Sequence, residues 1–168
     1  MLDLPGAGDG PTEGGSSLFS LTIEYAMRAM VALAAGDGRP MTTRQIAETM
    51  KVPQSYLSKV LQSLVRAGLV HSTRGLNGGF VLARRSEDLN MMEALNAVSP
   101  YKRIETCPLD LEGHSSQLCP LHRRLDHAMA MVQEAFEGTS LAEIMSDDNP
   151  CPTLQKQLAS LKPMEPDG

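Results

Sequence analysis

The 168-residue sequence lacks any apolar run close to the about 18 residues that a membrane-spanning helix requires, so we expect no transmembrane segment. Its first 16 residues lack the basic region and the apolar core of an export signal. They are rich in glycine, proline and acidic residues, so we expect residues 1–16 to be a disordered tail. Cysteine is scarce too: the three present, an odd number, fit a reducing cytoplasm better than a secreted disulfide framework.

The chain also lacks an excess of positive charge, since its formal net charge is −5. Taken alone, this negative charge argues against nucleic-acid binding. The distribution of charge indicates otherwise. Residues 20–85 carry a net charge of +6, whereas residues 1–19 carry −3 and residues 86–168 carry −8. A basic body with an acidic remainder is typical of a DNA-facing module joined to another unit. A chance fluctuation in surface charge is the alternative.

Three apolar patterns in the first half of the chain predict helices. Residues 18–35 repeat apolar side chains at spacings of three and four, and a Gly-Asp-Gly stretch stops the pattern. Thr42 and Gln45 have the spacing of a capping box at the start of a second, short helix. For a third helix, Pro53 suits the first helical position and Gly68 suits the end. Two short helices with a brief break between them predict a helix-turn-helix.

After the third helix the apolar period becomes alternating, which predicts two short strands. Asn77 and Gly78 would supply the hairpin turn between them. A helix-turn-helix followed by a β-hairpin is a winged helix, so the expected fold is mainly α with a small β-hairpin. One more helix, with Ser86 at its cap, would complete a winged helix-turn-helix DNA-binding domain over residues 17–99.

The second half of the chain has a different pattern. Residues 100–117 lack periodicity, and residues 118–146 are helical again, with a narrow apolar stripe typical of a helix-to-helix seam. We interpret this region as a dimerisation helix, although its own domain could also cover the stripe. A two-fold dimer would bind an inverted-repeat operator in double-stranded DNA. We expect residues 147–168 to form a flexible tail. The stripe consists of Leu118, Leu121, Leu125, Ala128, Val132 and Ala135.

A polar outer face remains on the second helix of the helix-turn-helix, and such helices present this face to base edges in the major groove. Tyr56 on this helix could contact a phosphate or pack. Thr43 and Arg44, which open the preceding helix, could hold phosphates, and Arg74 near the hairpin turn could enter a minor groove or hold phosphate. For each residue the alternative is an ordinary solvated side chain. The candidate base-reading residues are Gln54, Ser55, Ser58 and Lys59.

Three motifs carry a resemblance to a known family: EYAMRAMVALA on the first helix, PQSYLSKVLQSLVRAGLV on the recognition helix and RGLNGGFVLAR on the hairpin. They resemble the Rrf-type winged-helix regulators, which include the bacterial iron–sulfur cluster regulator and the nitric-oxide-sensitive repressor. The resemblance covers residues 18–145. It implies a homodimeric transcriptional regulator with an iron–sulfur cluster on a loop before the dimerisation helix, here residues 100–117.

The stretch TCPLDLEGHSSQLCPLH is where the resemblance places the cluster ligands. The family's first and third cysteines fall on Cys107 and Cys119, and the histidine of one branch falls on His122. The middle cysteine falls on Gly113, which has no side chain to bind a metal. His114, one residue further, could replace it.

One more ligand is implied by other branches of the family, in which an acidic residue before an aromatic residue on the first helix reaches the partner subunit's cluster. Glu24 matches that position. Two thiolates completed by imidazole or carboxylate suit a [2Fe–2S] cluster, which is the expected cofactor. The same groups could instead hold zinc, act as a thiol redox switch or bind no cofactor. We expect no role for Cys151 in the proline-rich tail.

These observations favour a sequence-specific transcriptional regulator that senses redox state, nitric oxide or iron–sulfur status through a cluster. A cluster-free regulator that acts through thiol redox chemistry or a protein partner is the alternative. An enzyme with Cys-His nucleophilic chemistry is not expected, because no third orienting group is evident and the loop is too short to build a pocket.

Overall fold

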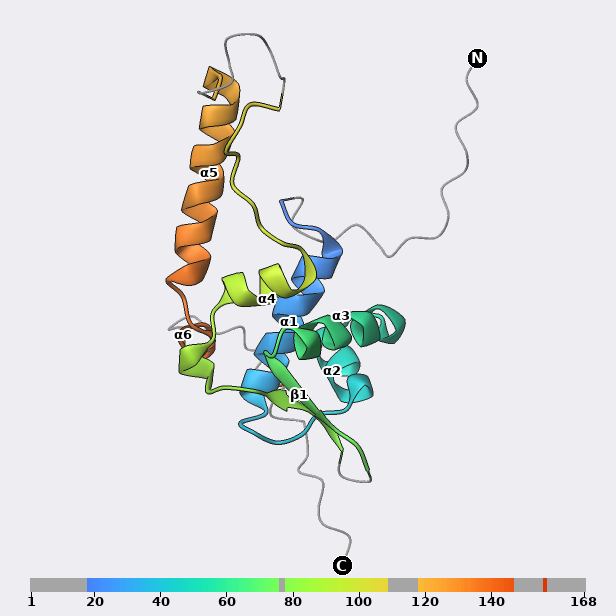
Figure 1. Ribbon diagram of the computed structural model, residues 1–168. Coiled ribbons are helices and arrows are strands. Elements are labelled where there is room, and N and C mark those ends of the chain that lie inside the picture. The colour runs from blue at the N-terminus through green and yellow to red at the C-terminus, as the bar shows by residue number, and fades with distance from the viewer. Residues whose placement is uncertain (1–17, 76–77, 109–117, 147–155, 157–168) are drawn as a thin grey trace, which may run out of the picture.

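The computed structural model of the chain describes residues 18–75, 78–108, 118–146 and 156. Within these residues the chain is mainly helical with one antiparallel hairpin, so the predicted fold class is confirmed (Figure 1). None of the described helices is long and apolar enough to span a membrane. The elements in chain order are α1 (Leu21–Ala35), α2 (Thr43–Met50), α3 (Gln54–Arg66), β1 (Val70–Thr73), β2 (Gly79–Leu82), the 3₁₀ turn η1 (Ser86–Asp88), α4 (Met91–Val98), α5 (Pro120–Glu137) and α6 (Leu141–Met145).

The core forms around α1, which lies at the centre of the domain and packs against α2, α3, α4 and α6 (Figure 1). Much of its buried face consists of small side chains, since Ala26, Ala29 and Ala32 are completely buried. Short side chains let neighbouring helices approach closely, and Met30 and Leu33 fill the space between them. The alanine face of α1 therefore sets how tightly the domain is packed.

The buried face of α3 opposes α1 and consists of Leu57, Leu61 and Leu64, all completely buried. Burying one such leucine contributes about 1.5–3 kcal/mol to folding. With the leucines turned inward, the polar residues of α3 lie on the outside of the domain, as the apolar spacing predicts.

The starts of α1 and α2 depend on capping side chains. α1 begins at Leu21 rather than at residue 18, because Ser20 caps it and accepts a hydrogen bond from the backbone N–H of Ile23 at 3.5 Å. The predicted capping box of α2 is confirmed. The Gln45 N–H donates to Thr42 Oγ1 at 3.2 Å, and the Thr42 N–H donates to Gln45 Oε1 at 2.8 Å.

The ends of α3 are set by a proline and a glycine. Pro53 precedes the first helical residue instead of occupying it, which corrects the predicted position by one residue. Its backbone is extended at ψ 125°, so it turns the chain from α2 into α3. Gly68 follows the helix at φ +72°, a left-handed conformation that glycine adopts without steric cost, and leads the chain into β1.

The hairpin pairs Val70 with Leu82 and Thr73 with Gly79, so residues 74–78 connect the strands. This connection is longer than a two-residue Asn-Gly turn, and Asn77 lies outside the described residues. The base of the hairpin is held by Met41, which precedes α2. The Phe80 N–H donates to the Met41 carbonyl at 2.8 Å, and the Met41 N–H donates to the Phe80 carbonyl at 3.0 Å.

The segment after the hairpin differs from the predicted helix with Ser86 at its cap. Residues 86–88 form only one 3₁₀ turn, and α4 begins after Asn90. The Glu93 N–H donates to Asn90 Oδ1 at 3.0 Å, and the Asn90 N–H donates to Glu93 Oε2 at 3.1 Å. This capping box fixes the start of α4 at Met91, whereas Ser86 is the first residue of η1 and caps no helix.

The predicted helix over residues 118–146 is also divided. α5 ends at Glu137 with Gly138 as its C-cap, and Ser140 caps the short α6 through a third capping box, with Glu143. α6 turns back onto the domain, where Leu141 is completely buried and donates its N–H to the Leu89 carbonyl at 2.9 Å. The expected tails, residues 1–16 and 147–168, lie outside the described residues except for Lys156.

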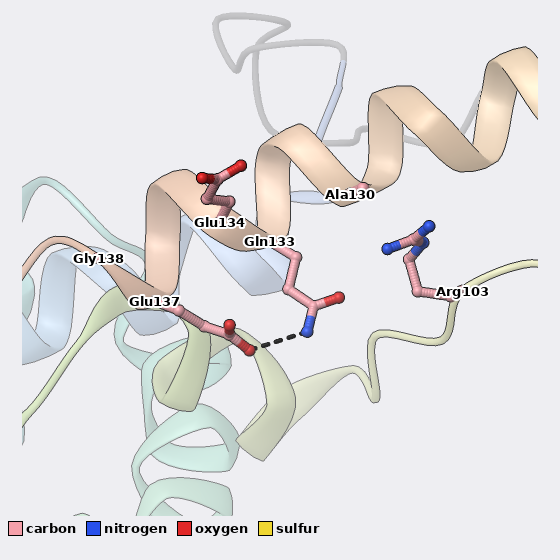
Figure 2. A pocket seen from close by; sticks show the side chains of 6 residues that line it. All are labelled: Arg103, Ala130, Gln133, Glu134, Glu137 and Gly138. Carbon is pink, nitrogen blue, oxygen red and sulfur yellow. Dashed lines mark hydrogen bonds between the residues drawn. The ribbon is translucent and has the colours of Figure 1, made fainter.

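α5 itself projects away from the domain (Figure 1). On one side of it lies a shallow hollow of about 440 Å³ lined mostly by polar residues, among them Arg103, Gln133 and Glu137 (Figure 2). Gln133 donates a hydrogen bond to Glu137 at 2.9 Å within α5. The hollow shows that the segment containing Arg103 runs alongside α5.

Candidate functional site

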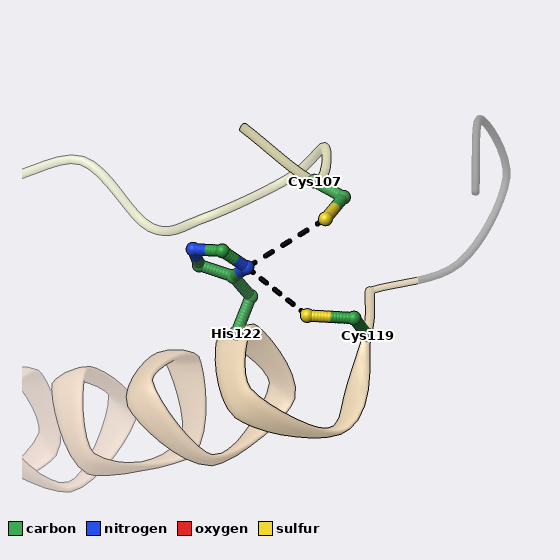
Figure 3. A group of neighbouring side chains, drawn as sticks. All are labelled: Cys107, Cys119 and His122. Carbon is green, nitrogen blue, oxygen red and sulfur yellow. Dashed lines mark hydrogen bonds between the residues drawn. The ribbon is translucent and has the colours of Figure 1, made fainter. Parts of the chain in front are cut away.

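Three possible metal ligands converge where the segment after α4 meets the start of α5. His122 Nδ1 lies 3.1 Å from Cys119 Sγ and 3.6 Å from Cys107 Sγ (Figure 3). All three ligand atoms lie within 4.8 Å of one another, and among the described residues only this group of Cys, His, Asp and Glu side chains is so arranged. Cys107 is buried, whereas Cys119 and His122 are half-buried.

The start of α5 places two of these ligands on one face. Cys119 is the N-cap, Pro120 is the first helical residue and His122 follows one turn later. The Cys119 side chain makes no capping hydrogen bond, so its sulfur is turned toward the imidazole ring. Cys107 reaches the same point from the separate segment that follows α4. The site therefore joins the winged helix to α5.

The separations fit ligands around a metal centre. In a tetrahedral site with metal–sulfur bonds of about 2.3 Å and a metal–nitrogen bond of about 2.0 Å, sulfur and nitrogen lie roughly 3.5 Å apart. The observed 3.1 and 3.6 Å are close to this value. Two thiolates and one imidazole would hold a metal ion with one position open. A two-iron cluster requires a fourth ligand and a wider spread, because its ligands are divided between two irons.

Two other ligands were predicted, of which His114 lies outside the described residues. Glu24 is on α1 in the middle of the domain, where it forms an ion pair with Arg28. The Glu24 Oε2 atom is buried and has no hydrogen-bond partner among the described residues. Within one chain Glu24 is therefore not among the ligand atoms that meet at Cys107, Cys119 and His122.

The α3 side chains predicted to contact DNA, which are the four base-reading candidates and Tyr56, lie on the outside of the helix. Gln54, Ser55 and Lys59 are exposed, and Tyr56 retains 53 % of its surface. Ser58 is half-buried and its hydroxyl donates to the Gln54 carbonyl at 3.0 Å, within its own helix. Four of the five residues are thus free to meet another molecule, whereas the Ser58 hydroxyl is partly used by α3.

The predicted phosphate contacts differ in exposure. Thr43 is half-buried, while Arg44 and Arg74 are exposed. Arg44 pairs with Glu48 at 2.7 Å, and the hydrogen bond that Arg44 donates to this carboxylate raises the pKa of the Arg44 guanidinium above its ordinary value. Sequence reasoning missed Lys51, an exposed lysine at φ +54° in the turn between α2 and α3. Its position in the turn of a helix-turn-helix was the available clue.

An apolar groove of about 900 Å³ runs beside α5, between it, the start of α1, α4 and residues 99–104. The predicted seam lines part of this groove through Leu125, Ala128, Val132 and Ala135. Leu125 retains 47 % of its surface and Leu121 retains 61 %. The stripe is therefore not covered by the described part of the chain itself, which was the alternative to a dimer seam.

Comparisons with known proteins agree with this architecture. A model of the Rrf2 family, described as iron-dependent transcriptional regulators, matches residues 19–147. A helix-turn-helix transcriptional regulator of Aquifex aeolicus is 26 % identical over 132 residues, which are 77 % of this chain and 92 % of the relative. Another from Azotobacter vinelandii is 29 % identical over 123 residues, which are 73 % of this chain and 75 % of the relative.

Two solved structures are similar as well. CymR, the global cysteine regulator of B. subtilis, matches with a TM-score of 0.64 and 26 % identity, over 78 % of this chain and 98 % of CymR. IscR of T. potens matches with a TM-score of 0.60 and 26 % identity, over 78 % of this chain and 88 % of IscR.

Proposed function

Because the chain belongs to the Rrf2 family of transcriptional regulators, we propose that it binds operator DNA as a homodimer and that a [2Fe–2S] cluster controls this binding. The observation that carries a metal centre in this proposal is the convergence of Cys107, Cys119 and His122 within 4.8 Å, at the junction of the winged helix and α5. The description of the family as iron-dependent favours iron at this centre. A group bound there touches both parts of the chain. Its presence or loss can therefore change how α5 is held against the domain.

In this proposal Cys107 and Cys119 hold the cluster as thiolates and His122 binds through Nδ1, the ring nitrogen that faces both sulfurs. The fourth ligand is His114 or the partner subunit's Glu24. When bound, a [2Fe–2S] cluster supplies a one-electron redox centre whose potential depends on its ligands and surroundings.

The dimer forms through α5. Its exposed leucines and the apolar groove beside it give a second copy an apolar surface to cover. In such a dimer the two α3 helices face DNA together and bind the two halves of an inverted repeat. A change in the angle of α5 alters the spacing of the two reading helices, and with it the fit to the operator.

In the reading head, Gln54, Ser55 and Lys59 contact bases, with Ser58 in a lesser role because its hydroxyl is already bonded to α3. Tyr56 contacts a phosphate. Thr43, Arg44 and Arg74 contact the phosphate backbone. The exposed face of α3 and the two exposed arginines support this assignment.

A cluster-free regulator is the second candidate, and one observation favours it. The three ligand atoms are close enough to surround a single metal ion, and the sulfur atoms lie within 4.8 Å of each other. The same residues would then hold one divalent ion or act as a thiol switch. The similarity to CymR, a cysteine regulator, is compatible with this candidate.

The decisive experiment is anaerobic reconstitution with iron and sulfide, followed by visible absorption and iron and sulfide analysis. For a [2Fe–2S] centre we expect about two irons and two sulfides per protomer. Cys107→Ala and Cys119→Ala should abolish the absorption, because one remaining thiolate holds the cluster weakly. Cys151→Ala is the matched control and should keep it. A wild-type protein without iron or sulfide would reject the cluster in favour of the cluster-free candidate.

A further inference from the structure

The segment after α4 is fastened to α5 by a cluster of hydrogen bonds near the candidate metal site. Arg103 binds Asp126 with two parallel hydrogen bonds, from Nε to Oδ1 at 2.6 Å and from Nη2 to Oδ2 at 2.5 Å. The Ile104 N–H donates to Asp126 Oδ1 at 3.0 Å. The Tyr101 hydroxyl donates to the Met129 carbonyl at 2.9 Å. A bidentate arginine–carboxylate pair fixes geometry more firmly than a single hydrogen bond.

The position of this cluster relates it to the ligands. Asp126 is four residues after His122 on α5, so both side chains lie on the same face of the helix. Ile104 is three residues before Cys107. The carboxylate therefore ties down the backbone that carries the first cysteine, one helical turn from the histidine which that cysteine faces.

The three ligands differ in what holds them. Cys119 and His122 belong to the same helical start, so α5 itself keeps them together. Cys107 comes from a separate segment, and its distance to His122 depends on how that segment lies on α5. The Asp126 side chain is 18 % exposed and the Arg103 side chain 38 %, so solvent screens the pair only in part. The hydrogen bond from Arg103 holds the pKa of Asp126 below its ordinary value, which keeps the carboxylate charged at neutral pH.

We infer that Arg103 and Asp126 are positioning residues that hold Cys107 at the metal-binding site. This inference rests on the proposed function, because it assumes that the site binds metal. Neither residue donates a ligand atom. Their role is to hold the three ligands in the metal-binding arrangement before metal binds. Mutation of residues that orient ligands without contacting the metal typically changes metal affinity by about 10–100-fold.

The test uses the metal-free full chain, titrated anaerobically with Co²⁺ as a spectroscopic probe. Asp126→Ala and Arg103→Ala should weaken Co²⁺ binding about 10–100-fold. The Co²⁺ that still binds should lose one of its two thiolate contributions to the near-ultraviolet absorption, because Cys119 and His122 stay together on α5. The spectrum should thus approach that of Cys107→Ala. A residue that only stabilised the fold would not select one thiolate.

Conservative variants separate positioning from loss of folding. Asp126→Asn keeps an acceptor for the Ile104 N–H, and Arg103→Lys keeps the charge. Both should bind Co²⁺ more tightly than the corresponding alanine variants and less tightly than wild type. Should an alanine variant unfold, as judged by circular dichroism of the metal-free form, the conservative variants decide. Glu137→Gln is the matched control, since it removes a carboxylate of α5 that accepts from Gln133, and it should bind like wild type.

The possible outcomes distinguish the positioning role of Arg103 and Asp126 from the proposed function. If wild type binds Co²⁺ and the Arg103 and Asp126 variants bind it equally well with both thiolates, the positioning role is wrong and the proposed function stands. Weakening in the Glu137→Gln control to the same extent also overturns it. If wild type binds neither Co²⁺ nor a cluster, the proposed function fails and this inference fails with it.

Discussion

His122 presents Nδ1 to both sulfur atoms, which has a consequence for its protonation (Figure 3). A neutral imidazole carries its proton on one nitrogen and offers a lone pair on the other. Metal binding at Nδ1 requires the tautomer with the proton on Nε2.

Lys59 is exposed on the outer face of α3, and its proposed contact with DNA can be tested directly. Lys59→Ala should weaken operator binding by roughly 1–3 kcal/mol if the ammonium contacts a base edge. The affinity for random DNA should fall much less. Fluorescence anisotropy with both DNAs at one fixed salt concentration measures the difference.

The matched control for Lys59 is Lys156→Ala, which removes the same charge from an exposed lysine outside the helix-turn-helix and the groove beside α5. It should leave operator affinity close to that of wild type. An equal loss on operator and random DNA for Lys59→Ala would make Lys59 a phosphate contact instead of a base-reading residue.

The candidate site could be foreseen only in part from its residues. The spacing of Cys107, Cys119 and His122 matched a family pattern, and the structure brings these three together. The pairing of Arg103 with Asp126 could not be foreseen, because 23 residues separate them and each resembles an ordinary surface charge. Only the path of the chain along α5 makes them partners.

Among the elements, local capping explains where sequence prediction succeeded and failed. The Thr42–Gln45 capping box was visible from spacing and is present. The Asn90–Glu93 and Ser140–Glu143 boxes are equally local, but they lie within continuous apolar patterns. The patterns therefore predict too early a start for α4 and continue the α5 helix through Gly138, where the structure ends it. Periodicity finds the face of a helix more reliably than it finds the end.

The proposed dimer depends on α5, and a substitution of Leu125 tests whether α5 forms its interface. Leu125→Glu should produce a monomer, because the seam would bury an unpaired carboxylate from each of the two copies. The single chain should still fold, since Leu125 is 47 % exposed in it. Sedimentation velocity gives the oligomeric state, and operator binding should weaken in parallel.

A matched change elsewhere on α5 controls for charge alone. His127 is exposed on the same helix and does not line the apolar groove, so His127→Glu should remain dimeric. A dimeric Leu125→Glu protein with normal operator binding would contradict the placement of the seam on this face.

At the scale of the whole molecule, α5 is connected to the winged helix at both ends. The segment carrying Cys107 meets its start, and α6 docks its end against α1 and η1 through Leu141 (Figure 1). A group bound at the start of α5 therefore acts on a helix whose other end is already anchored to the domain. This arrangement gives a physical route from the metal site to the spacing of the reading helices.

The measurement that tests the account most directly is the affinity of the loaded and the metal-free protein for the same DNA. A tight-binding fragment is first selected from a random pool, and its Kd is then measured anaerobically for both forms at one salt concentration. The account predicts affinities that differ by about 5–150-fold, the usual range of coupling between two sites. The difference should disappear in Cys107→Ala. Equal affinities for the loaded and metal-free wild-type protein would contradict the claim that this site controls DNA binding.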